Sequence, residues 1–178
     1  MKLNQPLHGE HIFLDCLDPS RVDDRYLSWL HNPLVNQHLE VRLALPGAVQ
    51  DIQEFVASTN ASDHSLLLGI HLAATGLHIG NIKLGPINAY HGTADVGLFI
   101  GEQQQWGKGY ASQAIGLLTQ HAFDALGLLK LTASCYASNL GSKNAFVKAG
   151  WQQEGIRLSQ FNTKAGREDC IMLGKVKT

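Results

Sequence analysis

Charged residues are scarce in this chain. Asp, Glu, Lys and Arg make up 16% of its 178 residues, against roughly 25% in typical soluble domains. Because 14 Lys and Arg face 15 Asp and Glu, the net charge of −1 provides no global attraction to nucleic acid or to an anionic membrane. Hydrophobic residues make up 44%, which is enough for a buried core and argues against disorder. We therefore expect a folded protein with no nucleic-acid or membrane partner.

Cysteine is rare, and long apolar runs are missing. The 3 cysteines, Cys16, Cys135 and Cys170, lack the close spacing of a zinc site or of a small disulfide scaffold, so we expect no metal and a reducing compartment. No apolar run approaches the roughly 20 residues that span a bilayer. Residues 1–13 also lack the apolar centre of a signal peptide. The predicted location is the cytoplasm.

The chain shows no internal repeat, no low-complexity tract and no linker rich in Pro, Gly or Ser. Its length is typical of one domain, and we expect a single domain over residues 1–178. The charges are unevenly distributed, because residues 1–89 hold 5 basic and 9 acidic side chains and residues 90–178 hold 9 and 6. An anionic ligand should therefore prefer the second half.

Hydrophobic periodicity predicts the elements. Apolar residues at helical spacing predict helices over 22–31, 48–58, 110–126 and 139–149. Short apolar or alternating segments predict strands over 11–17, 65–73, 77–87, 93–100, 128–137, 151–161 and 170–176. The three strands between 65 and 100 are joined by short turns and should form an antiparallel meander. This order predicts an α/β fold of the α+β type, a mixed sheet with helices inserted between strands.

A glycine-rich turn between Ile100 and Ser112 follows a strand and opens a helix. Glycine permits close backbone approach, and the first N–H groups of a helix lack intrahelical partners, so this arrangement can bind phosphate, with Lys108 adding a mobile charge. A P-loop would need Gly at Glu102 and Ser or Thr at Gly109, and a dinucleotide fingerprint would need Gly at Ser112. Spacing alone leaves an alternative, in which the turn only joins the strand to the helix and binds no ligand.

Two segments of the chain resemble a known family. Gln105–Ser112 and the long amphipathic helix after it resemble the acetyl-CoA pyrophosphate loop of the GNAT superfamily of acetyltransferases. Asn139–Gly155 resembles the second block of the RimJ/RimL branch, an Asn-x-x-Ser helix followed by Lys-x-Gly-aromatic and Glu-Gly. Tyr26–Leu30 and Asn32–Pro33 are also similar to that branch. The resemblance implies a mostly antiparallel central sheet of about seven strands with helices on both faces.

The resemblance implies acetyl-CoA as the co-substrate. In this family the pantetheine arm pairs with a splayed strand, which matches Leu98–Ile100, and backbone amides of the loop bind the pyrophosphate. Trp106 stands where the family usually has Arg or Gln, which leaves the backbone donors intact. Asn139 matches a residue that contacts pantetheine or positions a water. The implied cofactor-binding residues are Leu98, Phe99, Ile100, Trp106, Gly107, Lys108, Gly109, Tyr110, Ala111, Ser112, Asn139 and Phe146.

Acetyl transfer to an amine needs two proton-handling groups. Phe146 stands where many members carry the Tyr that protonates the departing thiolate, so Ser142 is the candidate for that role, unless it merely caps helix N–H groups. The amine must lose a proton, and Asp95, just before Val96-Gly97, is the candidate base, with a solvated carboxylate as the alternative. The weaker candidates for the base are Glu102, His78 and His91.

The sequence says least about the acceptor, the molecule that would receive the acetyl group. The resemblance places it against the first two helices and the loop after them, where the predicted substrate-binding residues are Trp29, Asn36 and Arg42, with His38 and Glu40 beside them. The acidic excess of the first half suits a cationic amine, whereas Arg42 could instead hold a phosphate.

Three functions stay open at this point. The first is N-acetylation of a protein N-terminal amine, as the RimJ/RimL resemblance implies. The second is N-acetylation of a small amine such as a nucleotide-linked amino sugar, because Gly80–Ile82 and Gly92–Asp95 also resemble enzymes of that kind. The third is an acyl-CoA-binding module without turnover, which Phe146 keeps open. The predicted partner is the amine substrate, and the predicted state is a monomer or homodimer.

Overall fold

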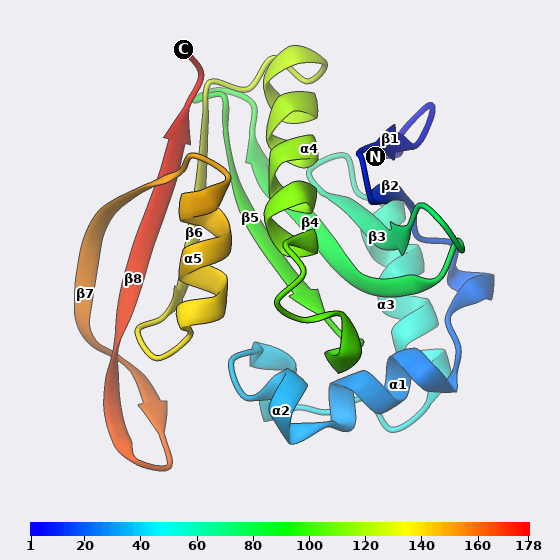
Figure 1. The fold of residues 1–178 in the computed structure, drawn as a ribbon, viewed down its shortest axis with the longest axis horizontal. Helices are drawn as coiled ribbons and strands as arrows, with labels where there is room; N and C mark the ends of the chain where they lie inside the picture. The colour runs from blue at the N-terminus through cyan, green and yellow to red at the C-terminus, as the bar shows by residue number, and fades with distance from the viewer.

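The computed structural model describes residues 1–178, and its strands form one eight-stranded sheet in the order β1-β2-β3-β4-β5-β6-β8-β7 (Figure 1). Every neighbouring pair is antiparallel except β5 and β6. The strands are β1 Leu7–His8, β2 Ile12–Cys16, β3 Leu66–Leu72, β4 His78–Asn88, β5 Thr93–Ile100, β6 Lys130–Tyr136, β7 Gln152–Thr163 and β8 Gly166–Val176. The predicted mixed, mostly antiparallel sheet is confirmed. The extra strand is β1, which is too short to show a period.

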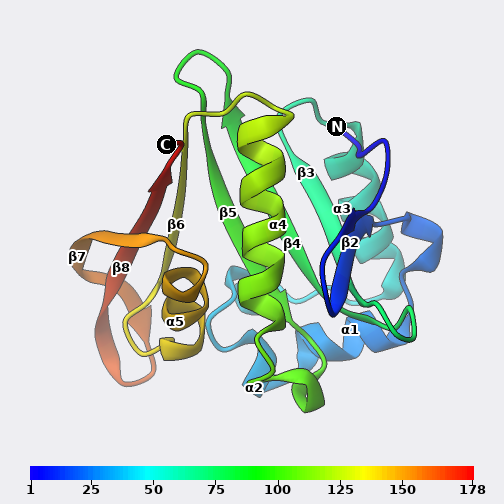
Figure 2. The ribbon, with the colours of Figure 1, turned by 45° about the horizontal axis from the view of Figure 1, so that its top comes forward.

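Helices cover both faces of the sheet, as predicted (Figure 2). They are α1 Asp24–His31, α2 Pro33–Asn36, α3 Val49–Ala61, α4 Tyr110–Asp124 and α5 Leu140–Lys148, with short 3₁₀ helices at Pro19–Arg21 (η1), Glu40–Leu43 (η2) and Gln103–Gln105 (η3). Helix α2 and η2 were not predicted, because four residues cannot display helical periodicity. None of the helices combines the length and the hydrophobicity needed to cross a membrane.

Each face has its own apolar core. On one face, Ala114, Ile115 and Leu118 of α4 pack against the sheet and are fully buried. On the other face, α1 and α3 pack together over β3, with Trp29, Ile52 and other apolar side chains buried between them. Because successive side chains of a strand point to opposite faces, each strand contributes side chains to both cores. The sheet is therefore the wall that separates two independent surfaces.

Strands β5 and β6 pair over only three residues each. Thr93, Ala94 and Asp95 face Lys130, Leu131 and Thr132, and no pairing continues beyond that point. The two strands then diverge toward the lower part of the view (Figure 1), while β6 remains paired with β8 up to Tyr136. The backbone of Val96–Ile100 consequently lacks a partner strand on its β6 side. This opening in the sheet is where the two faces communicate.

Candidate functional site

The glycine-rich turn forms a cradle at the start of α4. Gly109 is the N-cap of this helix with a φ of 82°, a conformation that favours glycine, and Trp106 Nε1 donates a hydrogen bond to the carbonyl oxygen of Ile100 at 2.8 Å. Lys108 Nζ is held by Gln105 Oε1 at 2.9 Å. The first N–H groups of α4, from Tyr110 onward, have no intrahelical partner and suit an anion. These are the donors that a pyrophosphate would need, and the pyrophosphate site stays a prediction.

A second cation, which the sequence reasoning missed, faces the cradle from α5. A Cβ at Gly109 would meet only Lys148 Nζ, at 3.6 Å, so the space in front of the turn is otherwise open. Lys148 is the Lys of the Lys-x-Gly-aromatic motif near the end of α5. The motif was visible in the sequence, but only packing brings this ammonium to the start of α4.

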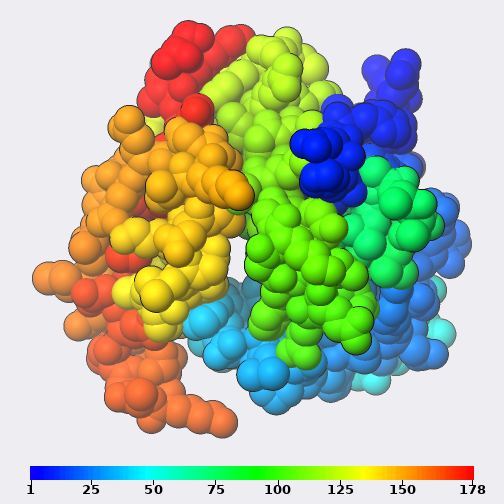
Figure 3. Space-filling view, in the orientation of Figure 1, coloured from blue at the N-terminus to red at the C-terminus, as the bar shows by residue number.

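The cradle opens into a cavity of about 610 Å³ between α4, α5, the end of β5 and the segment around α2. It appears as a hollow between α5 and the start of α4 in the space-filling view (Figure 3). Predicted residues that line it are Leu98, Phe99, Ile100, Trp106, Gly107, Gly109, Tyr110, Ala111, Ser112, Asn139 and Ser142. The shape, the unpaired strand edge and the cationic rim fit the pantetheine and pyrophosphate of acetyl-CoA.

Two predicted cofactor residues do not line this cavity. Lys108 stays at the outer side of the turn, bound to Gln105. Phe146 is only 2% exposed, lies in the core and contacts Trp151 edge-on with ring centroids 4.8 Å apart. An aromatic ring with no polar group gains more from this core position than from a polar cavity. The structure therefore places Phe146 as a packing residue.

Asn139 and Ser142 divide the tasks at the start of α5. Asn139 is the N-cap, and its Oδ1 accepts the N–H of Ser142 at 3.1 Å. Asn139 therefore caps the helix, and the Ser142 side chain is not needed as the N-cap. Burial raises the pKa of the nearby Cys135 thiol, and a hydrogen bond with the Ser142 side chain opposes this. Ser142 is half-buried on the cavity wall, which keeps it a candidate proton donor.

A larger cavity of about 1060 Å³ lies on the opposite face of the sheet, bounded by α1, η2, α3 and strands on both sides of the opening. It shares Leu39, Leu98 and Phe99 with the first cavity, so the two meet where β5 and β6 part. Asp95 lines it at the last paired position, and its carboxylate accepts a hydrogen bond from the Thr132 hydroxyl. A ligand entering here from the second face could reach one bound on the first.

Three of the predicted substrate-side residues, Trp29, Asn36 and Arg42, do not line this larger cavity, whereas Glu40 does. Trp29 donates its indole N–H to Glu102 Oε1 at 2.9 Å, and its ring packs so closely on Gly101 that a Cβ there would overlap it. Asn36 is buried, and its side-chain N–H donates to the carbonyl oxygen of Leu30 at 2.6 Å. Both side chains hold the elements that form the wall.

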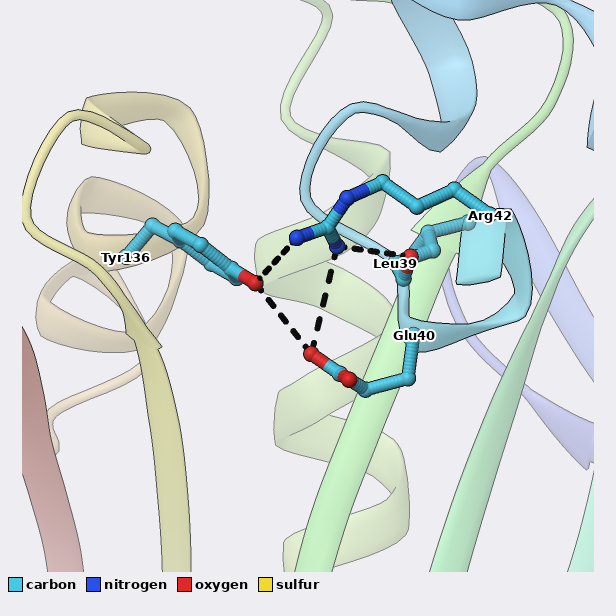
Figure 4. Close-up of polar contacts among 4 residues, drawn as sticks. All are labelled: Leu39, Glu40, Arg42 and Tyr136. Atoms are coloured by element: carbon cyan, nitrogen blue, oxygen red, sulfur yellow. Dashed lines mark hydrogen bonds and ion pairs between the residues drawn. The ribbon is translucent and has the colours of Figure 1, made fainter. Parts of the chain in front are cut away.

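Arg42 belongs to a polar cluster that bridges the opening between η2 and β6 (Figure 4). Its Nη2 donates to the Tyr136 hydroxyl at 2.7 Å and its Nη1 to the carbonyl oxygen of Leu39 at 2.9 Å. The Tyr136 hydroxyl donates in turn to Glu40 Oε1 at 3.2 Å, and its ring stacks on Phe161 with centroids 3.8 Å apart. The guanidinium is thereby engaged by the protein itself, which leaves little of it for a substrate phosphate.

The weaker candidates for a base lie elsewhere or are occupied. Glu102 accepts the Trp29 N–H, and His91 is exposed in the turn between β4 and β5. His78 lies outside the larger cavity, contacts Asn81 Oδ1 through Nε2 at 2.9 Å, and stands 5.0 Å from the His71 ring. Burial lowers the pKa of His78 to about 4. Of the four proposed bases, only Asp95 lines the larger cavity.

The sequence also matches curated relatives and a family model. Residues 15–152 match the family model described as an acetyltransferase (GNAT) domain. The uncharacterized N-acetyltransferase YoaA of Bacillus subtilis is 30% identical over 128 residues, which cover 72% of this chain and 71% of YoaA. The uncharacterized N-acetyltransferase p20 of Bacillus licheniformis is 28% identical over 174 residues, covering 97% of each chain.

Solved structures share the fold at low identity. A spermidine N-acetyltransferase from Vibrio cholerae, in complex with CoA and spermine, has a TM-score of 0.82 at 17% identity and covers 94% of this chain and 96% of its own. The microcin C7 self-immunity acetyltransferase MccE, with acetyl-CoA and AMP, has a TM-score of 0.79 at 19% identity, covering 95% and 94%. A proposed ribosomal-protein-serine acetyltransferase from Vibrio cholerae reaches 0.76 at 16% identity, covering 99% and 100%.

We predict that Gly109→Val abolishes binding of CoA and acetyl-CoA, because the added side chain fills the space in front of the first α4 amides. Gly127→Val is the matched control, since Gly127 also has a positive φ, of 68°, and open space around it but lies beyond the other end of α4. Both variants should lose similar stability through backbone strain. Isothermal titration of the folded proteins should then show binding only to wild type and Gly127→Val. Retained binding by Gly109→Val would remove the cradle assignment.

Stability should fall with acid because of His78. The unfolded chain has a His pKa of 6.5 and the folded protein about 4, so between these pH values the unfolded state binds a proton that the folded state does not. The free energy of unfolding should therefore decrease as pH falls from 6.5 to 4, by about 3 kcal/mol in total. Urea titrations at several pH values give the free energy of unfolding as a function of pH. Between pH 4 and 6.5 this free energy should depend less on pH in His78→Phe than in wild type, and as strongly as in wild type in His91→Gln. The same pH dependence in all three proteins would contradict the assignment.

Proposed function

The chain belongs to the GNAT acetyltransferase family and is an acyltransferase, and from this premise we propose that it transfers an acetyl group from acetyl-CoA to the N-terminal amine of a protein, as in the RimJ/RimL branch. Membership of a family of enzymes argues against a binding module without turnover. The N-terminal amine is the finer part of the proposal, and the larger cavity is the observation that carries it.

The larger cavity suits the first residues of an extended peptide. Its volume of about 1060 Å³ lies slightly above the range of roughly 300 to 1,000 Å³ that is typical of small-molecule sites. Apolar side chains such as Leu30, Ile52 and Phe55 supply much of its wall, which suits the side chains of a peptide better than it suits a bare polyamine. The similarity to a proposed ribosomal-protein-serine acetyltransferase over nearly the whole chain supports the same class of acceptor.

The positions of the two cavities fit direct transfer. The cradle would hold the pyrophosphate, and the unpaired β5 edge at Leu98–Ile100 would hold the pantetheine, which directs the thioester toward the opening in the sheet. The acceptor amine would arrive from the other face, beside Asp95. Each substrate keeps its own entrance, and only their reactive ends meet.

Asp95 and Ser142 are the proposed proton-handling residues. The amine must be neutral to attack the thioester carbonyl, and Asp95, held by the Thr132 hydroxyl, would accept its proton directly or through water. A C–N bond forms, the C–S bond breaks, and the CoA thiolate leaves. The nitrogen loses a second proton as it becomes an amide, and Ser142, on the wall of the cofactor cavity, would relay that proton to the sulfur and so keep its own hydroxyl. Phe146 lacks a donor and is buried away from the cavity, so it takes no part.

A small amine is the second candidate acceptor. The spermidine acetyltransferase and MccE share the fold over at least 94% of this chain, so the architecture accommodates such ligands. A nucleotide-linked amino sugar remains an acceptor of this class. The size and the apolar wall of the cavity favour the peptide, and a direct comparison decides between them.

The test is an acetylation assay with acetyl-CoA and three acceptor classes: peptides with a free N-terminus, polyamines, and nucleotide-linked amino sugars. We expect kcat/KM to be highest for a peptide and acetylation to occur on its N-terminal nitrogen, identified by mass spectrometry. The matched control is the same peptide with a blocked N-terminus, which should not react. A higher kcat/KM for either small-amine class would overturn the protein N-terminal assignment while leaving the acyltransferase in place.

We predict that Asp95→Asn lowers kcat by about 10²- to 10⁴-fold, the range of a lost general base, and leaves the affinity for CoA nearly unchanged. Asp63→Asn is the control, because Asp63 is exposed and lies outside both cavities. The loss should shrink as the pH rises, because more of the acceptor is already deprotonated. A kcat equal to wild type in the Asn variant would remove Asp95 from the mechanism.

A further inference from the structure

Some charged side chains of the larger cavity have hydrogen-bond or ion-pair partners in the protein, and others have none. Its carboxylates all have protein partners. Asp51 accepts the backbone N–H groups of Gly47 and Ala48 at 2.7 and 3.1 Å, and Glu154 pairs with Lys130 at 2.9 Å. The other two, Glu40 and Asp95, accept the hydroxyl groups of Tyr136 and Thr132. Each of these carboxylates therefore has at least one oxygen held by the protein.

The two cations of the same cavity, Lys83 and Arg157, have no such partners. Neither side chain forms an ion pair or donates a hydrogen bond. Lys83 is half-buried on β4, and Arg157 is exposed on β7, on the opposite side of the opening. Lys83 and Arg157 are therefore the charged side chains of this wall that have no polar contact with the protein.

Lys83 lies beside the reacting region. In the sheet register it stands opposite Gly97 of β5, so its side chain and the Gly97 position share one face. A Cβ at Gly97 would meet nothing within 4 Å, which leaves an open floor there. Asp95 is two residues back along β5 and therefore points to the same face. The Lys83 ammonium and the Asp95 carboxylate border this floor from two sides.

The apolar surroundings make the unpaired ammonium significant. Of the 27 residues that line the cavity, 15 are hydrophobic, so a bound ligand would exclude much of the water that solvates Lys83. An anion placed against it would then gain a charge-assisted contact in a low-dielectric site. Arg157, more exposed, would contribute attraction during approach and a planar donor pair at the rim.

The spacing limits where the anion sits on the acceptor. Diagonal neighbours on adjacent antiparallel strands are about 7 to 8 Å apart, and an extended chain advances about 3.3 to 3.6 Å per residue. We propose that the acceptor carries an anionic group, a carboxylate or a phosphate, within one or two residues of the amine, and that Lys83 binds it with Arg157 assisting at the rim. This inference rests on the proposed function and narrows its substrate class.

The test compares pairs of peptides that differ in one charge. Peptides beginning Ser-Glu, Ser-phosphoserine and Ser-Gln are assayed with acetyl-CoA against wild type, Lys83→Gln, Arg157→Gln and the control Arg167→Gln, whose Arg lies near the β7–β8 turn outside the cavity. In wild type we expect kcat/KM to be about tenfold higher for an anionic peptide than for Ser-Gln, as expected for one charge-assisted contact. The peptide with the larger increase in kcat/KM over Ser-Gln shows whether the site prefers a carboxylate or a phosphate.

The variants separate recognition from folding. Lys83→Gln should remove most of the preference, so that the ratio of kcat/KM between an anionic peptide and Ser-Gln falls toward one. Arg157→Gln should lower this ratio partly, and Arg167→Gln should retain it. In Lys83→Glu the preference should reverse toward a Ser-Lys peptide. Equal losses for charged and neutral peptides in Lys83→Gln would mean that Lys83 is structural, and would overturn the inference.

Failure of the inference and failure of the proposed function give different results. If wild type acetylates anionic and neutral peptides equally, the inference falls and the acyltransferase assignment stands. If no peptide reacts, the proposed acceptor class falls, and the inference is then decided by isothermal titration with the same peptides and a nucleotide-linked amino sugar. Binding of an anionic probe that is lost in Lys83→Gln supports it, and equal binding by both proteins overturns it.

Discussion

Beyond the position where Asp95 faces Thr132, β5 and β6 share no backbone pairing, and β6 continues with β8 alone. A parallel pair that ends after three residues leaves one strand edge bare over Val96–Ile100. In an ordinary sheet such an edge inside the fold would cost stability, because its N–H and C=O groups are strong donors and acceptors. Here the bare edge lies between two cavities, where a ligand can complete it.

The opening needs walls that do not close over it. Beside β5, the Trp29 indole packs against Gly101 and donates a hydrogen bond to Glu102, which fixes α1 to the loop after β5. On the other side, Arg42 and Tyr136 join η2 to β6 across the gap. These contacts are made by aromatic and guanidinium groups, whose size and rigid donors hold elements that share little backbone pairing. They keep the two cavities separate except where β5 and β6 part.

The electrostatics differ between the two cavities. The cavity at the start of α4 combines helix N–H groups with Lys148, a cationic rim that suits a pyrophosphate. In the larger cavity each carboxylate has a protein partner, whereas Lys83 has none. Counting acids and bases in the first half of the sequence gave an acidic balance and favoured a cationic acceptor, whereas in the fold the charged side chains of the larger cavity without a protein partner are Lys83 and Arg157. A charge count does not reveal which charges are already paired.

The sequence by itself determined the order of strands and helices and the glycine-rich turn, because periodicity and turn chemistry act over a few neighbouring residues. The β1 strand, α2 and η2 were missed because elements this short have no period. Tertiary packing alone decided which side chains line the cavities: it drew Trp29, Asn36 and Phe146 into structural contacts and brought Lys83 and Lys148 to the walls of the two cavities. Exposure to a cavity is a property of residues distant in sequence, since it depends on what packs opposite, and no local pattern encodes that.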